Sequence, residues 1–435
     1  MATGRWIGVL GAGPAGLYAA NKLAKNGHQV VLLNRDIRPG GLAEYGIFHN
    51  KHRMKAGLRK MFHKILSNEN IHYRGNVTIG DNEVLQLSDV AQLGFDSVLV
   101  AVGAQGIKWL NIEGSEAGHI YDAKQLVYHY NQLPPYATQV YPLGRHLTII
   151  GAGNVAIDIA HYAVQQNVET VTLLVRRGPN QVKYTKKEIK LIGGHVDLSA
   201  FASEMERIAP ALRLIGEDVA DTYGRMTESF GTQRIDGSHT KIKFRFATSA
   251  LAVDTDQSGT IESLRFCDNE LYGDQGGIRC RSTERTSALE TDSLVFCVGD
   301  AVDPEFGLPL NRWGEYALAG DEDNARSYGV VGRDGWFAAG WARLASDGLV
   351  GKARKDGEMA CDHIETYLEQ QGPRNGRPLD ALDAILKARG HSVVDWLGYL
   401  GIRERENEIA QAQGLDDFRF ETNADMLALC TPVAG

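Results

Sequence analysis

The sequence predicts an α/β protein built from two similar three-layer units, the second inserted in the first. Two observations carry this prediction. A strand, a tight glycine turn, a helix and a second strand follow one another near the N-terminus, and the same order recurs from residue 146. With 435 residues, 43% of them hydrophobic, the chain is long enough for two or three domains.

The first repeat of this pattern is "WIGVLGAGPAGLYAANKLAKNGHQVVLLNRD", in which Gly11, Gly13 and Gly16 form Gly-x-Gly-x-x-Gly. The first glycine allows the turn, the second lets the backbone approach a pyrophosphate, and the third lets the helix pack on the strand. This glycine pattern is weak evidence alone. Here it follows an apolar strand, opens a helix and precedes a second strand, so the segment predicts a Rossmann unit.

The second repeat is "HLTIIGAGNVAIDIAHYAVQQNVETVTLLVRR", with Gly151, Gly153 and Ala156 at the matching positions. Both loops keep the small residues that the turn requires. Two Rossmann units predict two bound dinucleotides, each with its pyrophosphate at a helix N-terminus. A degenerate second unit is the alternative interpretation.

The ends of the second strands distinguish the two ligands. An acidic residue there typically binds ribose hydroxyls, whereas arginines accommodate a 2′-phosphate. The second unit ends in Arg176 and Arg177, whose guanidinium groups suit a phosphate, so it is predicted to bind NADPH. The first unit ends in Asn34, which can still bond a ribose hydroxyl, and Asp36 follows two residues later.

The remaining segments divide the chain into a split first domain, residues 1–112 and 330–435, around a second domain of residues 113–329. Within the second, "IKFRFATSALAVDTDQSGTIESLRFCDNELYG" alternates with Gly and Asp turns and predicts an antiparallel meander. "GWFAAGWARLASDGLVGKARKDGEMACDHIETYL" predicts a strand, a glycine loop and a helix that returns to the first domain. A helical tail is expected from about residue 375.

The composition excludes several classes of protein. A net charge of -8 argues against nucleic-acid binding. The five cysteines form no CxxC pair and no metal-ligand spacing, which suits a reducing compartment. No apolar stretch approaches the length of a membrane span, and a cytoplasmic protein is expected.

Four segments together carry a family resemblance. They are "PGGLAEYGIFHNKHRMK", "YDAKQLVYHYNQLP", "RRGPNQVKYTKKE" and "AAGWARLASDGLVG". The chain resembles the adrenodoxin reductase-type ferredoxin–NADP reductase family over most of its length. The "RRGPNQVKYTKKE" segment is the most specific, with Tyr184 where the family has phenylalanine.

This resemblance implies an FAD domain with an inserted NADPH domain, and electron transfer from NADPH through FAD to a ferredoxin or similar iron–sulfur protein. FAD itself carries the reaction, so no catalytic residue is nominated. The resemblance implies FAD contacts at Gly11, Gly13, Pro14, Ala15, Gly16, Asn34, Gly41, Leu42, Gly46, Val102, Gly103, Trp341, Gly348, Leu349 and Val350. It implies NADPH contacts at Gly153, Asn154, Val155, Arg176, Arg177 and Glu188.

The chain departs from the family pattern at three places. Asn34 stands where the family has glutamate, and Glu44 stands where arginine is common. The loop before the last glycines reads "ARLASDG", which places Asp347 where the family has a basic stretch with Gly-Pro. The departures therefore concern the FAD side.

An acidic iron–sulfur partner predicts a basic docking face, for which the candidates are Lys183, Lys186, Lys187, Arg207 and Arg213. Three other functions are consistent with two Rossmann units. They are a glutamate-synthase small-subunit-like NADPH flavoprotein, a flavin monooxygenase, and a non-catalytic flavoprotein that acts as a scaffold or redox sensor. The first is disfavoured because no cysteine precedes Cys267, and a thioredoxin-reductase type is excluded by the missing CxxC.

Overall fold

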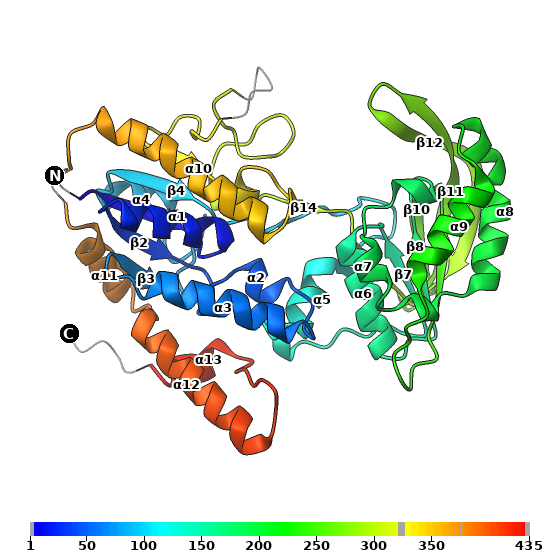
Figure 1. The fold of residues 1–435 in the computed structure, drawn as a ribbon, viewed down its shortest axis with the longest axis horizontal. Helices are drawn as coiled ribbons and strands as arrows, with labels where there is room; N and C mark the ends of the chain where they lie inside the picture. Colours follow the sequence, from blue (N-terminus) through cyan, green and yellow to red (C-terminus); the bar gives the residue numbers. More distant parts are fainter. Residues whose placement is uncertain (1–3, 321–326, 375, 431–435) are drawn as a thin grey trace. The chain divides into compact units, whose positions relative to one another are not determined.

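The computed structural model describes residues 4–320, 327–374 and 376–430. The chain forms two compact units, which Figure 1 shows in ribbon form. Unit 1 comprises Met1–Ile107, Tyr128–Thr138 and Gly299–Gly435, and unit 2 comprises Lys108–Val127 and Gln139–Val298. Each unit contains a five-stranded parallel sheet, which confirms the predicted α/β class.

The sheet of unit 1 has the strand order β15-β4-β1-β2-β3, and every pair is parallel. Its strands are β1 (Trp6–Leu10), β2 (Gln29–Leu33), β3 (Ile71–Arg74), β4 (Ser97–Val100) and β15 (Trp336–Ala338). They are rich in Val, Leu and Ile because a parallel sheet is covered on both faces. Strand β1 lies at its centre, between β4 and β2, so the loop between β1 and the next helix opens at the middle of the sheet.

Helices and loops cover both faces of this sheet. One face carries α1 (Pro14–Lys25), α3 (His52–Leu66) and α10 (Val350–Glu369), whose apolar residues share a core cluster with the strands. The other face carries α4 (Leu87–Gln92) and α11 (Pro378–Ala388). The short helix α2 (Leu42–Tyr45) lies between α1 and α3 in the chain, and α5 (Ala123–Tyr130) begins in unit 2 and ends in unit 1.

The C-terminal part of unit 1 is helical, with α11 followed by α12 (Trp396–Gln413) and α13 (Asn423–Leu427). Both α12 and α13 contribute to a small separate core in which Tyr399, Ile402 and Met426 pack with Ile37 and Val394. Ile37 belongs to the segment after β2. The tail is therefore packed against the part of unit 1 that follows the first Rossmann repeat.

The parallel sheet of unit 2 has the order β6-β13-β7-β8-β9. Its strands are β6 (Ile120–Asp122), β7 (His146–Ile150), β8 (Thr170–Leu174), β9 (Lys241–Arg245) and β13 (Ser293–Phe296). The helices of the unit are α6 (Asn154–Gln165), α7 (Lys186–Ile189), α8 (Leu198–Leu214) and α9 (Val219–Phe230).

A second sheet in unit 2 is antiparallel, with the order β10-β11-β12. It consists of β10 (Thr248–Thr255), β11 (Ile261–Asp274) and β12 (Gly277–Glu290). Its apolar residues, such as Leu264 and Phe266, share a core cluster with Ile150 and Phe296 of the parallel sheet. Beyond that cluster, β11 and β12 continue as a long hairpin.

The unit boundaries differ from the predicted domain limits of 112/113 and 329/330. The chain returns to unit 1 at Gly299 because β14 (Asp300–Ala301) pairs with β5 (Gly106–Ile107). Side chains from the following segment, including Phe306 and Tyr316, then pack in the core of unit 1. The described residues 299–320 and 327–329 therefore lie with the first Rossmann repeat and not with the second.

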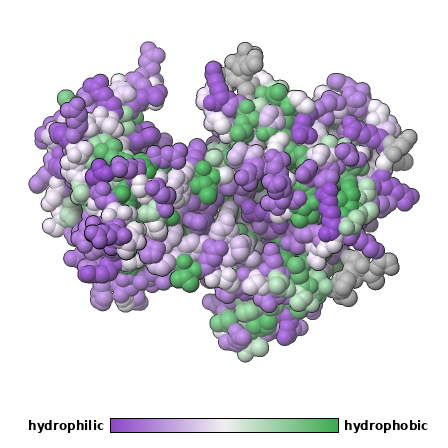
Figure 2. Space-filling model, turned by 180° about the vertical axis from the view of Figure 1, so that it is seen from behind, coloured by the Kyte–Doolittle hydropathy of each residue, from purple (hydrophilic) through white to green (hydrophobic). Residues whose placement is uncertain are grey.

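The face in Figure 2 carries many hydrophilic residues, with hydrophobic residues in small groups between them. Among the residues that the structure describes, no helix combines the length and apolarity needed to cross a membrane.

Candidate functional site

The first glycine loop joins β1 to α1. The N–H of Gly11 donates to the Leu33 carbonyl at 2.7 Å, and its φ of 104° is one that glycine adopts freely. A Cβ on Gly16 would lie 1.9 Å from the carbonyl oxygen of Gly11, so helix and strand can cross only without that atom. A Cβ on Gly13, by contrast, would meet no chain atom within 4 Å. The space in front of Gly13 is open, as a pyrophosphate requires.

The second glycine loop, between β7 and α6, repeats this geometry. The N–H of Gly151 donates to the Leu174 carbonyl at 3.0 Å, its φ is 136°, and a Cβ there would lie 2.3 Å from the Cys297 carbonyl oxygen. A Cβ on Gly153 would again meet nothing within 4 Å. Ala156 occupies the third position and is fully buried. The second loop therefore keeps the backbone geometry that a dinucleotide-binding loop requires, which disfavours the interpretation of this unit as degenerate.

In both units the segment after the second strand folds back onto the glycine loop. The N–H of Gly40 donates to the Ala12 carbonyl at 2.8 Å. The N–H groups of Lys183 and Tyr184 donate to the Ala152 carbonyl at 2.7 and 3.2 Å. Each loop is thus held by hydrogen bonds from a segment that also carries the family resemblance, "PGGL" in unit 1 and "NQVKYT" in unit 2.

The helix that follows each loop begins without a side-chain cap. Gly13 and Gly153 are the N-cap residues, and neither has a side chain that could accept from the first N–H groups. Those N–H groups and the positive end of the helix dipole favour an anion. The chain thus has two helices that begin without a side-chain cap, and each begins at a glycine with open space in front of it. These features define it as a protein with two dinucleotide-binding sites.

Asn34 is buried and uses its carboxamide inside unit 1. Its Oδ1 accepts from the Ala12 N–H at 3.0 Å, and its Nδ2 donates to the carbonyl oxygens of Asp36 at 2.7 Å and Arg38 at 3.1 Å. A carboxylate could not donate in this way. Asn34 therefore ties the glycine loop to the segment after β2, and a ribose contact by this residue stays a prediction.

The other residues predicted to contact FAD all lie in unit 1. Pro14 and Ala15 form the first turn of α1, and Gly41 precedes α2. Gly41 has a φ of 51°, and a Cβ there would lie 3.0 Å from the Gly13 Cα, so this glycine lies directly beside the open one. Leu42 starts α2, and its carbonyl accepts from the Gly46 N–H at 2.8 Å.

Val102 and Gly103 follow β4 and are partly exposed. Gln105 was not predicted, but its Nε2 donates to the Val102 carbonyl at 3.1 Å, and its Oε1 accepts from Arg35 at 3.1 Å and from the Tyr128 hydroxyl at 3.2 Å. Gln105 thus connects the ends of β4 and β2 with α5. In the sequence, the one indication of this role is that Gln105 lies two residues after Gly103, where an apolar run ends.

The loop before α10 contains the predicted contacts Trp341, Gly348, Leu349 and Val350. Trp341 is half-buried, and its Nε1 donates to the Asp347 carbonyl at 3.3 Å. The Asp347 side chain pairs with Lys352 in the first turn of α10 at 2.6 Å. The acidic departure from the family pattern is therefore balanced by a lysine within the same loop and helix.

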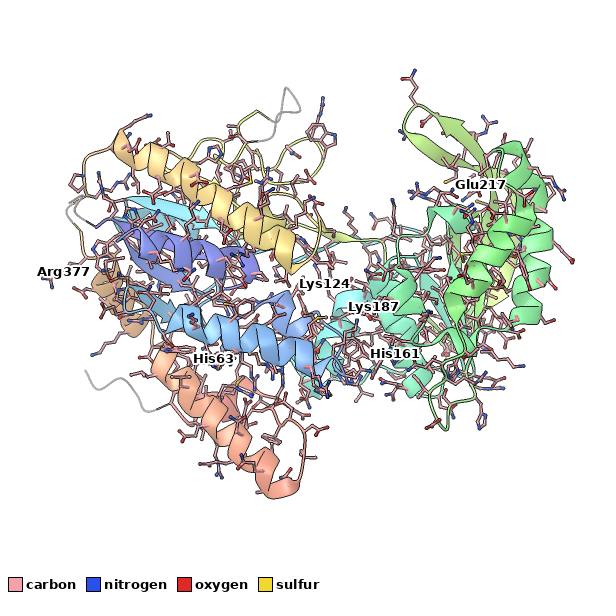
Figure 3. All side chains as sticks on the ribbon, in the orientation of Figure 1. His63, Lys124, His161, Lys187, Glu217 and Arg377 are labelled. Atoms are coloured by element: carbon pink, nitrogen blue, oxygen red, sulfur yellow. The ribbon has the colours of Figure 1, made fainter. Side chains whose placement is uncertain are left out.

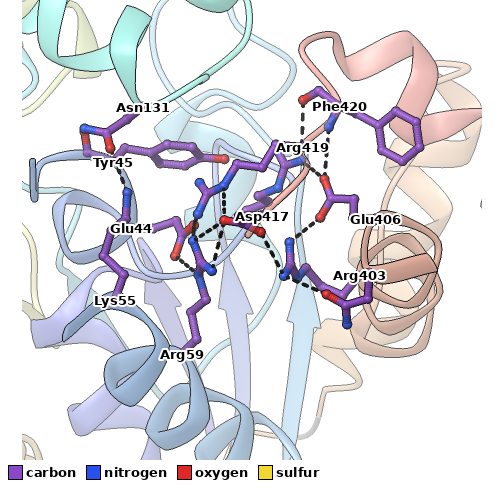
Figure 4. A network of polar contacts seen from close by, with 12 residues as sticks. Glu44, Tyr45, Lys55, Arg59, Asn131, Arg403, Glu406, Asp417, Arg419 and Phe420 are labelled. Carbon is purple, nitrogen blue, oxygen red and sulfur yellow. Dashed lines mark hydrogen bonds and ion pairs between the residues drawn. The ribbon is translucent and has the colours of Figure 1, made fainter. Parts of the chain in front are cut away.

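The second departure, Glu44, is the centre of a buried charge network (Figure 4). The network consists of Arg38, Glu44, Arg59, Arg403, Glu406, Asp417 and Arg419. Glu44 accepts from Arg59 Nε at 2.9 Å and Nη2 at 3.0 Å, and it pairs with Arg419 Nη2 at 2.6 Å. Although burial alone lowers the pKa of Arg59, this pKa is raised because of the attraction and hydrogen bonds of Glu44.

The network joins the C-terminal tail to the start of unit 1. Asp417 pairs with Arg59 at 3.4 Å and with Arg419 at 3.2 Å, and Glu406 pairs with Arg38 and accepts from the Phe420 N–H at 3.1 Å. An acid at position 44 is therefore matched by arginines from α3 and from the segment after α12. The carboxylate at position 44 is therefore neutralised by ion pairs within unit 1.

Lys55 of α3 lies beside the network and is also buried. Its Nζ donates to Asn131 Oδ1 at 2.7 Å, and Asn131 Nδ2 donates to the Tyr45 carbonyl at 2.8 Å. Burial lowers the pKa of Lys55 to about 8, against the opposing attraction of Glu44. This chain of contacts fixes the end of α2.

The residues predicted to contact NADPH all lie in unit 2. Arg176 and Arg177 lie just after β8, separated from it by Val175, and both line one cavity of about 580 Å³. Asn154 and Val155 form the first turn of α6, where Asn154 Oδ1 accepts from the Thr185 N–H at 2.9 Å. Glu188 lies on α7.

The predicted docking residues fall into two groups. Lys183, Lys186, Lys187 and Arg213 are exposed, and Figure 3 labels Lys187 on α7. Arg207 is instead held by Glu204 at 2.8 Å and by Asp268 at 3.1 Å. The guanidinium of Arg207 is therefore paired with carboxylates within unit 2, and a docking role for this residue stays a prediction.

Known proteins resemble the chain over most of its length. Residues 7–192 match the family model "Pyridine nucleotide-disulphide oxidoreductase". NADPH-ferredoxin reductase FprA of Mycobacterium leprae is 25% identical over 400 residues, covering 85% of this chain and 84% of that protein. The mitochondrial NADPH:adrenodoxin oxidoreductase of Drosophila melanogaster is 27% identical over 457 residues, covering 97% and 92%.

The fold comparison agrees. The structure of Mycobacterium tuberculosis FprA in complex with NADPH matches with a TM-score of 0.82 at 22% identity, covering 98% of this chain and 99% of that one. The predicted resemblance to the adrenodoxin reductase-type ferredoxin–NADP reductases is thus confirmed: the chain is similar in sequence to these oxidoreductases, and its fold matches that of FprA.

Proposed function

We propose that this chain is an FAD-dependent oxidoreductase that takes electrons from NADPH and passes them through FAD to a small iron–sulfur protein of the ferredoxin type. The observation that carries the proposal is the pair of open glycines, Gly13 and Gly153, each at the uncapped start of a helix in its own unit. The named activities of the relatives, NADPH-ferredoxin and NADPH:adrenodoxin reduction, support the same assignment.

In this proposal unit 1 holds FAD and unit 2 holds NADPH. The "PGGL" segment braces the first loop, and Gly41 leaves room beside Gly13 for the FAD pyrophosphate. Arg176 and Arg177 at the end of β8 supply cations where a 2′-phosphate is expected. The remaining contacts predicted from the sequence belong to the same proposal.

Bound FAD would supply the conversion of a two-electron hydride donor into one-electron transfers. The chain itself binds and orients the two nucleotides. The first N–H groups of α10, from Val350 onward, lack partners within the helix and would stabilise negative charge beside them. Lys352 holds the Asp347 carboxylate by an ion pair, which limits repulsion at this helix start.

The partner is proposed to be an acidic ferredoxin-like protein. The exposed Lys183, Lys186, Lys187 and Arg213 of unit 2 would attract it, because complementary charge accelerates association. We also propose a cytoplasmic location, for which the five cysteines without a disulfide bond are the support.

Anaerobic mixing of the FAD-loaded protein with NADPH or NADH tests the proposal. Loss of the visible band of oxidised flavin with NADPH, and much slower loss with NADH, is the expected result. Reoxidation by a plant-type or adrenodoxin-type iron–sulfur protein, followed at the acceptor's own band, tests the second half-reaction. A flavin that keeps its band in NADPH would refute the proposed activity and favour the scaffold or sensor alternative.

A further inference from the structure

The cavity beside Arg176 and Arg177 is also lined by residues that lie outside the second Rossmann repeat. Arg176 and Arg177 line one side of its roughly 580 Å³. The β11–β12 hairpin lines the other side with Tyr272 of β11 and Arg279 of β12. The hairpin belongs to the antiparallel sheet, so the cavity joins the two sheets of unit 2.

Two contacts hold the hairpin in place over the end of β8. Asn269 is buried, with 3% of its surface exposed, and its Nδ2 donates to the Arg176 carbonyl at 2.8 Å and to Ser249 Oγ at 2.9 Å. The Arg177 Nη1 donates to the Ile278 carbonyl at 3.3 Å. The hairpin is therefore held to the segment after β8 through both of its strands, by Asn269 of β11 and by Ile278 of β12, and part of the guanidinium of Arg177 is used for this.

The cavity is positively charged. Arg176, Arg177 and Arg279 line it, and none of the described residues that line it is acidic. The carboxylate of Asp274, at the end of β11, pairs with Arg279 from outside the lining. An arginine has five donors, so Arg279 can keep this ion pair and still bind a phosphate oxygen.

We propose that the β11–β12 hairpin forms part of the binding site for the 2′-phosphoadenosine end of NADPH. Arg279 and Arg176 bind the 2′-phosphate from opposite sides, and Tyr272 offers its ring as a wall for the adenine. Arg177 contributes mainly by holding the hairpin. This inference rests on the proposed use of NADPH and adds to it a residue that lies 103 positions beyond Arg176 in the sequence.

Calorimetric titration of the full-length, FAD-loaded protein with 2′,5′-ADP and with 5′-AMP tests the proposal, because the two probes differ only in the 2′-phosphate. Arg279→Gln is expected to weaken 2′,5′-ADP binding about tenfold and to leave 5′-AMP within about twofold. The matched control is Arg285→Gln. Arg285 lies on the same strand, is also exposed and also pairs with an aspartate, but it does not line the cavity. It is expected to change neither affinity by more than about twofold.

A second variant probes the same contact in the opposite direction. Asp274→Asn frees Arg279 from its ion pair and is expected to tighten 2′,5′-ADP binding severalfold, but not when Arg279→Gln is also present. If Arg279→Gln binds 2′,5′-ADP as tightly as Arg285→Gln does, the role of the hairpin is refuted while NADPH use stands. If the unaltered protein does not prefer 2′,5′-ADP over 5′-AMP, the proposed use of NADPH itself fails.

Discussion

Replacing Glu44 by glutamine should destabilise unit 1 strongly, because Glu44 neutralises two arginines that are largely removed from water. The side chains of Glu44 and Arg419 are 5% and 4% exposed, and that of Arg59 is 17% exposed. Breaking a buried ion pair by removing one partner typically costs about 3–5 kcal/mol. Asp417 still pairs with both arginines, so the lower end, about 3 kcal/mol, is expected for Glu44→Gln.

Urea denaturation followed by flavin release measures this loss in the unit that contains the network. The control is Glu408→Gln, which removes an acid from an exposed pair in the same unit: the side chains of Arg405 and Glu408 are 54% and 56% exposed. Water and salt screen such a pair, so a far smaller loss is expected. Equal losses in the two variants would show that burial of the Glu44 carboxylate does not determine its contribution, and the network would then have no special role in stability.

The remaining predictions concern the glycine loops, the paired arginines and the buried lysine. Gly16→Ala should lower the thermal unfolding midpoint of the apoprotein, because the new Cβ would lie 1.9 Å from a backbone oxygen. Gly13→Ala should leave that midpoint unchanged, because its Cβ would meet no chain atom, and should weaken FAD binding in a fluorescence titration. Replacing Arg176 and Arg177 together by alanine should raise KM for NADPH roughly 10–100-fold and leave NADH nearly unaffected in steady-state assays; an equal loss with NADH would contradict the 2′-phosphate assignment. Burial lowers the pKa of Lys55 in the folded state to about 8, below its ordinary value of 10.5. Below pH 8 the folded protein must bury a charged amine, which lowers the free energy of unfolding, and this loss disappears as the pH rises toward 10.5. The unfolding free energy of the unaltered protein minus that of Lys55→Met should therefore increase by roughly 2–3 kcal/mol between pH 7 and 10, as measured by urea denaturation; a pH-independent difference would contradict the burial of a charged amine.

The two glycine loops could be predicted from the sequence because their chemistry is local. Gly11 and Gly16 are five positions apart, and the strand, turn and helix around them form one continuous segment. The requirement for small side chains arises from contacts within that segment, such as the approach of Gly16 to the Gly11 carbonyl. The same reasoning applied to the second repeat, where Ala156 is accommodated with no exposed surface.

Asn34 and Glu44 could be identified as departures, but their roles could not be predicted. The amide of Asn34 is satisfied by loop atoms whose positions depend on the packing of the segment after β2. Glu44 is paired with Arg419, a residue 375 positions later in a tail whose charges look like those of a solvated helix. Charge inversion at one position gives no indication of where the compensating charges lie.

The return of the chain to unit 1 near Gly299 was missed for a related reason. The strand before it, "SLVF", is followed three residues later by Gly299, as the end of a Rossmann unit should be, but the next residues contain no long apolar run. Their place in unit 1 depends on the short pairing of β14 with β5 and on scattered aromatic residues such as Tyr316. Two-residue strands have no periodic signal that a sequence could display.

The features that could not be predicted all depend on contacts between segments that are far apart in the sequence, and the same dependence applies to the choice of cofactor. A glycine loop at a helix start accepts any dinucleotide pyrophosphate, because it recognises the phosphates through backbone N–H groups. Selection between nucleotides needs side chains at the far end of the ligand, and the one proposed for NADPH, Arg279, comes from a hairpin remote in sequence from the glycine loop. The C-terminal tail, equally remote, holds Glu44 of α2 through Arg419. Variation in the hairpin should therefore change the preference between NADPH and NADH without changes in either glycine loop. Variation in the tail should act on FAD retention through stability. The two effects can be separated by measuring 2′,5′-ADP affinity and flavin release on the same variant.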